Sequence, residues 1–369
     1  MQIALKDIMP ILFFVLFIIT DVQAQDYAPS SADRTSASIY VYNRIDEDQY
    51  PDTNIRAEQF QAQIDEITSG SYVVTSVGDI ISALKNKKNL PDRTIALSFD
   101  GGYKSFFEIA YPLLERHDLP YTLFISTDHI DSDNPQYMNW SELRKIAKSD
   151  LATIGIMPSS YTRIYNEDDN EIRRQINKAK TRYREELGKQ PAYFTYPFGE
   201  HNAKFRDIVE KSGFIAAFGQ QSSVLNSTDD IYSLPRFAMT ETFGNIARFR
   251  LTANALPLAA TITSPTATML DKPLETVRLK ISEDITAEQI EDISCFISGA
   301  GKAAIENNTP HELIITTDYP VDSERIRLNC TLPLPISGNL DEKRWRWFGA
   351  LFIYQRDAAM AQDMSSSAN

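Results

Sequence analysis

One buried segment constrains the fold of this chain more than any other: residues 94–103, whose sequence is TIALSFDGGY. The run is apolar, as expected of a strand covered on both faces, and it ends on Asp100 followed by a turn of two glycines. Barrel enzymes place catalytic groups at the C-terminal ends of such buried parallel strands. The segment therefore predicts a parallel α/β architecture with Asp100 at a candidate site.

Strand and helix patterns alternate along the chain on either side of this segment. Stretches with helical periodicity separate five short β-type runs, at residues 38–42, 121–126, 151–156, 193–196 and 214–218. The clearest helix is predicted over residues 170–187, with Gly188 as its stop. Repeated alternation at this spacing predicts a parallel sheet, either open and doubly wound or closed into a barrel, and periodicity alone does not separate the two.

The composition changes near residue 257. Residues 259–273 are rich in Pro, Thr, Ser and Ala, which predicts a linker. Alternating runs follow within residues 274–356, as in half-buried antiparallel strands. The last residues, 357–369, are small and polar and predict a disordered tail. The sequence therefore predicts a first domain over residues 37–258 and a small β-rich domain over residues 274–356.

The N-terminus has the pattern of an export signal. Lys6 precedes an apolar run over residues 8–19, and the small residues before position 25 fit cleavage after Ala24. Residues 1–24 are therefore predicted to be a signal peptide and residues 25–36 a flexible leader. The run is shorter than the about 20 apolar residues that span a bilayer. We expect a secreted or periplasmic protein with no transmembrane segment after cleavage; an uncleaved N-terminal anchor is the alternative.

The net charge limits the classes of partner that the chain can bind, and the two cysteines bear on its redox compartment. The formal net charge of -13 argues against nucleic acid and anionic membranes as partners. It suits a neutral or cationic substrate, or simple solubility. In an exported protein, Cys295 and Cys330 predict one disulfide, with two buried free thiols as the alternative. A metal site on these cysteines is not expected, because two thiols lack the further ligands that zinc needs.

The segment 94–103 resembles the first motif of the polysaccharide deacetylases of the NodB-homology family, normally Thr-Phe-Asp-Asp-Gly-Tyr. The resemblance covers residues 38–258 and implies an irregular (β/α)7-type barrel. The β-rich domain is similar to appendages of some exported members. In this family a divalent metal such as zinc polarises the acetamide carbonyl and activates a water, and an aspartate removes the proton of that water. The resemblance places Asp100 at the position of this base.

The metal ligands of the family are replaced in this chain. The second aspartate of the first motif falls on Gly101, and the two histidines of a His-x-x-x-His motif fall on Met157 and Tyr161, within residues 154–163 (IGIMPSSYTR). A further histidine of the family corresponds to Asn43. A thioether, a phenol and an absent side chain do not form a site for a hard or borderline cation. The resemblance therefore implies no metal cofactor for this member.

Other family features remain. Residues 193–199 (YFTYPFG) resemble the third motif, which lines the acetyl-binding groove, and the segment LPR at 234–236 resembles a later Pro-Arg segment that supports the site. For Asp100 an alternative stays open, in which it caps the turn or pairs with an arginine of that later segment. The resemblance assigns substrate binding to Tyr196, Pro197, Phe198, Gly199 and Arg236.

The histidines and two tryptophans have competing interpretations. His117, His129, His201 and His311 are all interpreted as surface residues. In the alternative, His129 and His201 form a relocated site with Asp100. Trp345 and Trp347 alternate along a predicted strand, so they either fill the core of the β-rich domain or stack against a sugar.

The predicted function is polysaccharide binding. The sequence predicts an exported, catalytically impaired family member that binds polysaccharide, including polymers that contain N-acetylglucosamine, in the retained groove. The first alternative is an active polysaccharide N-deacetylase with a relocated or metal-independent site. The second is an envelope interaction module that acts through the β-rich domain.

Overall fold

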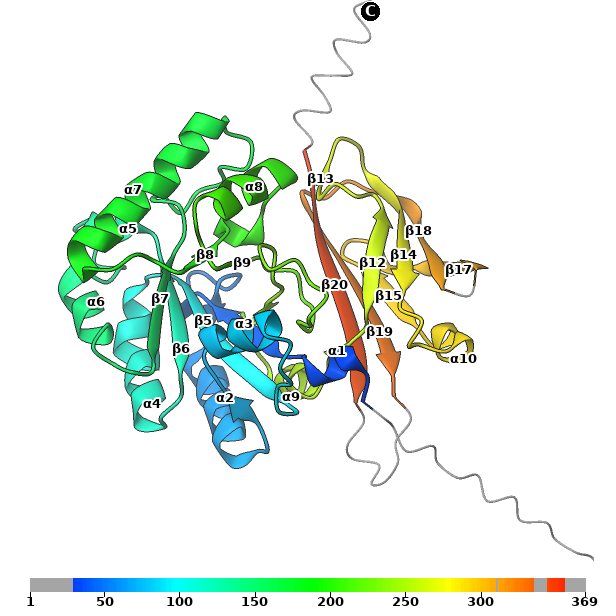
Figure 1. Ribbon diagram of the computed structural model, residues 1–369, viewed down its shortest axis with the longest axis horizontal. Helices are drawn as coiled ribbons and strands as arrows, with labels where there is room; N and C mark the ends of the chain where they lie inside the picture. Colours follow the sequence, from blue (N-terminus) through cyan, green and yellow to red (C-terminus); the bar gives the residue numbers. More distant parts are fainter. Residues whose placement is uncertain (1–28, 310, 335–343, 356–369) are drawn as a thin grey trace, which may run out of the picture.

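The computed structural model describes residues 29–309, 311–334 and 344–355. These residues form two parts that lie side by side in Figure 1, a parallel sheet surrounded by helices and a β-rich part. This is the barrel with an added β-rich domain that the sequence predicts. The predicted signal peptide over residues 1–24 and the predicted tail over residues 357–369 lie outside the described residues. Within the described ranges, no helix has the length and apolar character that a bilayer crossing requires.

The first part is built on an eight-stranded parallel sheet that curls into a partial barrel. The strand order is β10-β1-β5-β6-β7-β8-β9, and β4 pairs with the start of β5. Every residue of β5 is buried between β1 and β6, which explains the apolar run at 94–99. The strands are β1 Ser38–Tyr42, β4 Val73–Val74, β5 Thr94–Gly101, β6 Tyr121–Ile125, β7 Ala152–Ile156, β8 Tyr193–Thr195, β9 Ala216–Phe218 and β10 Phe237–Ala238.

Amphipathic helices cover the outside of this sheet (Figure 1). The longest, α7, begins after the side-chain cap of Asp168 and ends at Gly188, whose φ of 71° is the left-handed conformation typical of a helix stop. After β5 a π-helical turn, Phe106–Ala110, precedes α4, because Pro112 has no N–H to continue the regular ladder. The helices are α2 Ala57–Ser69, α3 Val77–Lys85, α4 Tyr111–Arg116, α5 Thr127–Asp131, α6 Trp140–Ile146, α7 Asp169–Leu187, α8 Ala203–Lys211 and α9 Ile246–Ala253.

The β-rich part contains two sheets. One has the order β11-β20-β19-β15-β16, with β13 also paired to β20, and the other has the order β12-β14-β18-β17. The disulfide Cys295–Cys330 joins β15 to β19 inside the core of this part, which confirms the predicted pairing. The elements are β11 Leu256–Pro257, β12 Ala260–Ser264, β13 Met269–Leu270, β14 Leu274–Ile281, α10 Ala287–Glu291, β15 Ser294–Ile297, β16 Gly301–Lys302, β17 Ala304–Thr309, β18 Glu312–Val321, β19 Arg325–Pro333 and β20 Trp345–Tyr354.

Strand β20 connects the two parts closely. Leu351 and Ile353 of this strand belong to the same buried cluster as the barrel core. The backbone of Gly349 approaches the barrel so closely that a Cβ added there would lie 1.9 Å from the carbonyl oxygen of Ser222. Arginines of the β-rich part also form ion pairs with acidic residues of the first part: Arg325 with Glu200, Arg344 with Asp92 and Arg346 with Asp33.

Two predicted boundaries are corrected by the structure. The leader predicted over residues 25–36 contains a short helix, α1 Ser31–Arg34, because buried Asp33 of this helix pairs with Arg346, 2.6 Å away. The linker predicted over residues 259–273 contains β12 and β13, which pair with the C-terminal sheets. Strand β11 also joins the β-rich part, so the first part ends before Leu256 and not at residue 258.

Candidate functional site

Asp100, at the end of β5, forms a buried ion pair with Arg236. The guanidinium donates to both carboxylate oxygens, at 2.7 and 2.8 Å. It also donates to the carbonyl of Gly219 at 2.9 Å and to the hydroxyls of Ser98 and Thr195. Both charged side chains are fully shielded from solvent. This is the pairing that the sequence left open for Asp100. The contacts of Arg236 lie within the core, and its assignment to substrate binding stays a prediction.

The position after Asp100 has no room for a side chain. Gly101 has a φ of +104°, a conformation that residues with a Cβ rarely adopt. A Cβ at this position would lie 2.5 Å from a ring carbon of Tyr103. That ring is itself held in place, because it stacks on Tyr137 with centroids 5.3 Å apart and the guanidinium of Arg44 lies 4.0 Å above it. A carboxylate at position 101 therefore requires the displacement of Tyr103.

Tyr161 occupies one of the replaced histidine positions. It is hydrogen-bonded to Asn43, which occupies a further replaced histidine position. Its hydroxyl accepts a hydrogen bond from the amide of Asn43 at 2.9 Å, and its ring stacks on Phe198 with centroids 4.9 Å apart. Burial raises the pKa of Tyr161 well above its ordinary value, and the negative charge of Asp100 raises it further. The phenol is therefore protonated at neutral pH, so it acts neither as an anionic ligand nor as a base.

The replaced ligand positions do not fit a divalent cation. Gly101 offers no donor atom, the phenol of Tyr161 is protonated, and Met157 is buried in a core cluster with Phe124 and Phe218. Among the described residues, no group of three or more His, Cys, Asp or Glu side chains is placed to hold a metal ion. The side chains that surround Asp100 are instead those of a packed, hydrogen-bonded core.

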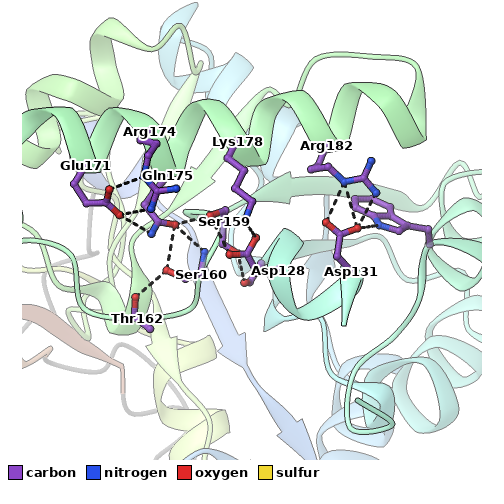
Figure 2. Close-up of polar contacts among 12 residues, drawn as sticks. Asp128, Asp131, Ser159, Ser160, Thr162, Glu171, Arg174, Gln175, Lys178 and Arg182 are labelled. Atoms are coloured by element: carbon purple, nitrogen blue, oxygen red, sulfur yellow. Dashed lines mark hydrogen bonds and ion pairs between the residues drawn. The ribbon is translucent and has the colours of Figure 1, made fainter. Parts of the chain in front are cut away.

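The segment that carries Tyr161 is hydrogen-bonded to side chains of α7, as Figure 2 shows for its neighbours Ser159 and Ser160. The side-chain oxygen of Gln175 accepts hydrogen bonds from the hydroxyl of Ser159 and from the backbone N–H of Ser160, the latter at 3.1 Å. One helical turn further on, Lys178 pairs with Asp128 at 2.8 Å. This polar network holds the loop after β7 in one conformation and so fixes the ring of Tyr161.

Within the third motif, neighbouring residues point to opposite sides. Tyr196 is fully buried: its ring stacks on His201 with centroids 4.2 Å apart, and its hydroxyl donates to the carbonyl of Tyr232 at 2.8 Å. Phe198 is only half-buried and covers Tyr161. Substrate binding by Tyr196 and Phe198 stays a prediction, and of the two side chains only that of Phe198 is partly exposed.

Pro197 and Gly199, the other two residues assigned to this motif, are buried in the turn between β8 and α8. Pro197 is buried, so it offers no surface to a ligand. Gly199 is buried as well, and a Cβ added to it would lie 2.4 Å from the backbone nitrogen of Gln220. Both residues pack the turn that carries Phe198, and their assignment to substrate binding stays a prediction.

A cavity of about 440 Å³ opens beside the Tyr161–Phe198 stack, and we call it the barrel-end cavity. Arg163 of the barrel and Arg325 of β19 both line it, and both pair with Glu200, which is almost fully buried. Burial raises the pKa of Glu200, and the two arginines oppose this shift. Sequence reasoning missed this cluster, because its members come together only when the two parts dock.

Gln220 separates the barrel-end cavity from the buried ion pair. Its side chain lines the cavity, and its amide nitrogen lies 3.5 Å from the carboxylate of Asp100. Asp100 is itself 1% exposed, and its two oxygens already accept from Arg236. The arrangement therefore presents aromatic, amide and guanidinium groups to a ligand, while the carboxylate of the base position is engaged inside the fold.

The histidines proposed for a relocated site have separate partners. His201 contacts the carbonyl of Gly199 at 3.2 Å and the hydroxyl of Ser233 at 2.8 Å, and burial lowers its pKa to about 4. His129 stacks on Tyr137 with centroids 4.0 Å apart, and burial lowers its pKa, against a smaller opposing effect of the backbone of Gly101. His201 is thus a packed residue and not the surface residue that the sequence suggests.

Comparison with known proteins agrees with the fold and the motifs. Residues 87–217 match the sequence model of the family described as polysaccharide deacetylase. A protein of Staphylococcus aureus (strain MSSA476) named poly-beta-1,6-N-acetyl-D-glucosamine N-deacetylase is 21% identical over 199 residues, which are 51% of this chain and 68% of the relative. An Escherichia coli (strain K12) protein of the same name is 23% identical over 223 residues, 50% of this chain and 33% of the relative.

A solved structure shows the same fold. The Streptococcus pyogenes deacetylase in complex with acetate superposes with a TM-score of 0.55 at 15% identity, over 59% of this chain and 98% of that chain. The segment that matches the family model, residues 87–217, contains β5 and Asp100, and it ends before the β-rich part. The curled parallel sheet, the family match and the motif segments agree: residues 87–217 are similar to the polysaccharide deacetylase family, and the first part of the chain has the NodB-homology fold.

Proposed function

We propose that this protein is an exported family member that binds a polysaccharide containing N-acetylglucosamine and does not hydrolyse it through a metal centre. The glycan lies in the barrel-end cavity, against the Tyr161–Phe198 stack. The class of glycan is taken from the relatives, which are named as deacetylases of poly-beta-1,6-N-acetyl-D-glucosamine. Aromatic rings and amides are groups that bind sugars by stacking and hydrogen bonding.

The packing around Gly101 carries this proposal. The space next to Asp100 that a metal-binding carboxylate needs is occupied by the ring of Tyr103. The histidine position at Tyr161 holds a protonated phenol that is bonded to Asn43. The hydrogen bond between Asn43 and Tyr161 supports a stable alternative to the metal site, since each of these two replacements satisfies a polar group of the other.

Export is part of the proposal and rests on the sequence and the disulfide. The apolar run at residues 8–19 and the cleavage position at Ala24 belong to a part of the chain that the structure does not describe. The bond between Cys295 and Cys330 supports an oxidising compartment, because disulfides persist in secreted and periplasmic proteins and are rare in the cytosol.

Three measurements on the purified chain test the proposal: metal content, acetate release from N-acetylglucosamine oligomers, and calorimetric binding of these oligomers in the presence of EDTA. We expect no stoichiometric metal, no acetate release, and binding that survives EDTA. Phe198→Ala is expected to weaken binding by about 2- to 12-fold, as the loss of one aromatic contact implies. Tyr319→Ala removes an aromatic ring that is 53% exposed and does not line the barrel-end cavity, so it is the matched control.

Two other results favour the alternatives. Stoichiometric zinc, or acetate release that a chelator abolishes, indicates an active N-deacetylase and contradicts the proposal. Absence of glycan binding, with no metal and no acetate release, indicates an envelope interaction module whose contacts are made by the β-rich part.

A further inference from the structure

A second cavity, of about 520 Å³, lies where the barrel meets the β-rich part, and we call it the interdomain cavity. Helix α9 and β10 line it from the barrel side, and β15, β19 and β20 line it from the other side. It adjoins the barrel-end cavity, because Ala238, Phe243 and Arg327 line both. Its volume is within the range of about 300–1,000 Å³ that is usual for small-molecule sites.

Aromatic side chains form much of its wall. Trp345 and Trp347 are two residues apart on β20, so they lie on the same side of the strand, and both are half-buried. Trp347 is held in place by a hydrogen bond from its indole N–H to the side chain of Asn329 at 3.1 Å. Phe243 and Phe296 are 42% and 45% exposed, unusual values for phenylalanine. These rings offer flat apolar surface of the kind that stacks on a sugar ring.

Two arginines in this cavity have no acidic partner among the residues that the structure describes. Arg248 donates to the backbone carbonyls of Phe243, at 2.9 Å, and of Ala238, at 3.2 Å. Arg327 makes no side-chain hydrogen bond or ion pair within that part of the chain. By contrast, Arg325, two residues earlier on the same strand, pairs with Glu200.

The electrostatics of the two arginines agree with this geometry. Burial lowers the pKa of Arg248 to about 10, and the positive charge of Arg327 lowers it further. The pKa of Arg327 is lowered by burial and then by the charge of Arg325. The charge of Glu200 opposes the lowering at Arg327 but does not reverse it. A partly buried cation with no carboxylate at ion-pair distance is costly, and it is unusual in a chain whose formal net charge is -13. An anion bound between Arg248 and Arg327 removes that cost.

We propose that the interdomain cavity binds an acidic sugar residue of a polysaccharide, with its carboxylate between Arg248 and Arg327 and its ring against Trp345 and Phe296. Guanidinium groups bind carboxylates through paired hydrogen bonds. This inference rests on the proposed function, because the polymer that enters the barrel-end cavity continues into this one. It adds a charged sugar to the polymer, which the neutral N-acetylglucosamine unit does not supply.

The test compares a uronic acid tetrasaccharide with the same tetrasaccharide after reduction of its carboxylates to alcohols, measured by calorimetry with the whole chain. The acidic form is expected to bind at least about tenfold more tightly, because it alone forms charged hydrogen bonds with the arginines. Arg327→Gln is expected to remove this preference. Arg278→Gln makes the same change of charge in β14, outside both cavities, and is expected to alter affinity by less than about twofold, as is usual for an exposed charge.

A second variant separates stacking from charge recognition. Phe296→Ala removes an exposed ring, and it is expected to weaken both forms of the tetrasaccharide by a similar factor, about 2- to 12-fold. Equal affinity for the two forms overturns the proposal, and so does an equal effect of Arg327→Gln and Arg278→Gln. Tetraglutamate that binds as tightly as the acidic tetrasaccharide overturns the assignment to a sugar. A uronic acid monosaccharide that binds as tightly overturns the assignment to a polymer segment.

The outcome is independent of the test of the barrel-end cavity. Neutral N-acetylglucosamine oligomers with Phe198→Ala examine that cavity alone. Binding of these oligomers without binding of the acidic tetrasaccharide contradicts the inference and leaves the proposed function intact. Binding of the acidic tetrasaccharide without the neutral oligomers supports the interdomain site and contradicts the proposed class of glycan.

Discussion

The arginine at the barrel end and the arginine in the interdomain cavity differ in burial and in bonding. Arg236 is fully buried and bonds to Asp100 and three further oxygen atoms of the core. Arg327 lines a cavity, and no carboxylate lies within ion-pair distance of it among the described residues. The arginine that pairs with the motif aspartate is therefore packed inside the core, while Arg327 lines a cavity and has no carboxylate of the described residues at ion-pair distance.

The largest expected effect comes from breaking the buried ion pair. Asp100→Ala leaves the guanidinium of Arg236 buried without its partner, so the free energy of unfolding should fall by about 3–5 kcal/mol. The double variant Asp100→Ala with Arg236→Met should be more stable than the single variant, because no uncompensated charge remains. Urea denaturation measures both. A loss below about 1 kcal/mol for the single variant contradicts the description of this end as a core.

Removal of the disulfide should have the next largest effect. Replacing Cys295 and Cys330 together by serine opens a loop of sequence separation 35 and should lower the free energy of unfolding by about 3–4 kcal/mol. Because Phe296 and Asn329 flank the two cysteines and line the interdomain cavity, affinity for the acidic tetrasaccharide should fall as well. Reduced wild-type protein is the control and should behave as the serine variant does. Binding unchanged by reduction indicates that the cavity walls do not depend on this bond.

Gly101→Asp tests the packing that replaces the metal site. The new side chain meets the ring of Tyr103 in an unfavourable backbone conformation, so we expect a loss of about 1–3 kcal/mol of stability. The same substitution made in a Tyr103→Ala background should cost less, because the contact is gone. Zinc calorimetry on Gly101→Asp should show no stoichiometric binding. Tight zinc binding by this single variant contradicts the account of the site.

His201 should make stability depend on pH. Its pKa is lowered to about 4 by burial, so between pH 6.5 and 4 the unfolded chain binds the proton more readily than the folded chain. Stability contributed by the neutral ring is complete above pH 6.5 and is lost as the pH falls towards 4, by about 1–2 kcal/mol after allowance for partial exposure. His201→Gln should flatten this part of the profile relative to the wild-type protein. Equal profiles for the variant and the wild-type protein contradict the assignment.

The smallest effect on stability is expected for Arg327→Gln. Its side chain makes no hydrogen bond or ion pair in the described part of the chain, so the free energy of unfolding should change by less than about 0.5 kcal/mol. The same variant should lose its preference for the acidic tetrasaccharide. A loss of stability above about 2 kcal/mol shows instead that Arg327 is structural, and it removes the contrast with Arg236.

Local pattern was enough to predict a parallel α/β sheet and a β-rich part after it, while the barrel followed from the family resemblance. The apolar run at β5, the amphipathic face of α7 and its stop at Gly188 are properties of consecutive residues, and the structure agrees with each. Failures occurred where a distant residue decides the conformation. The sequence around Asp33 predicts a flexible leader, because the ion pair with Arg346 that fixes this segment is formed with a residue far along the chain.

The candidate site was predicted in part for the same physical reason. Asp100 and Gly101 lie on a recognisable strand and turn, so their place at the barrel end could be predicted. The opposite directions of Tyr196 and Phe198 depend on the fold of one short turn, which composition does not reveal. The arginines of β19 enter the two cavities only because the β-rich part docks on the barrel, and no periodic pattern in the sequence reports that docking.

The contact between Gly101 and Tyr103 also sets the order of any return to metal chemistry. An aspartate introduced first at position 101 meets the aromatic ring, whereas a small residue introduced first at position 103 opens the space. A second carboxylate at position 101 is therefore reached most easily when Tyr103 is replaced before Gly101.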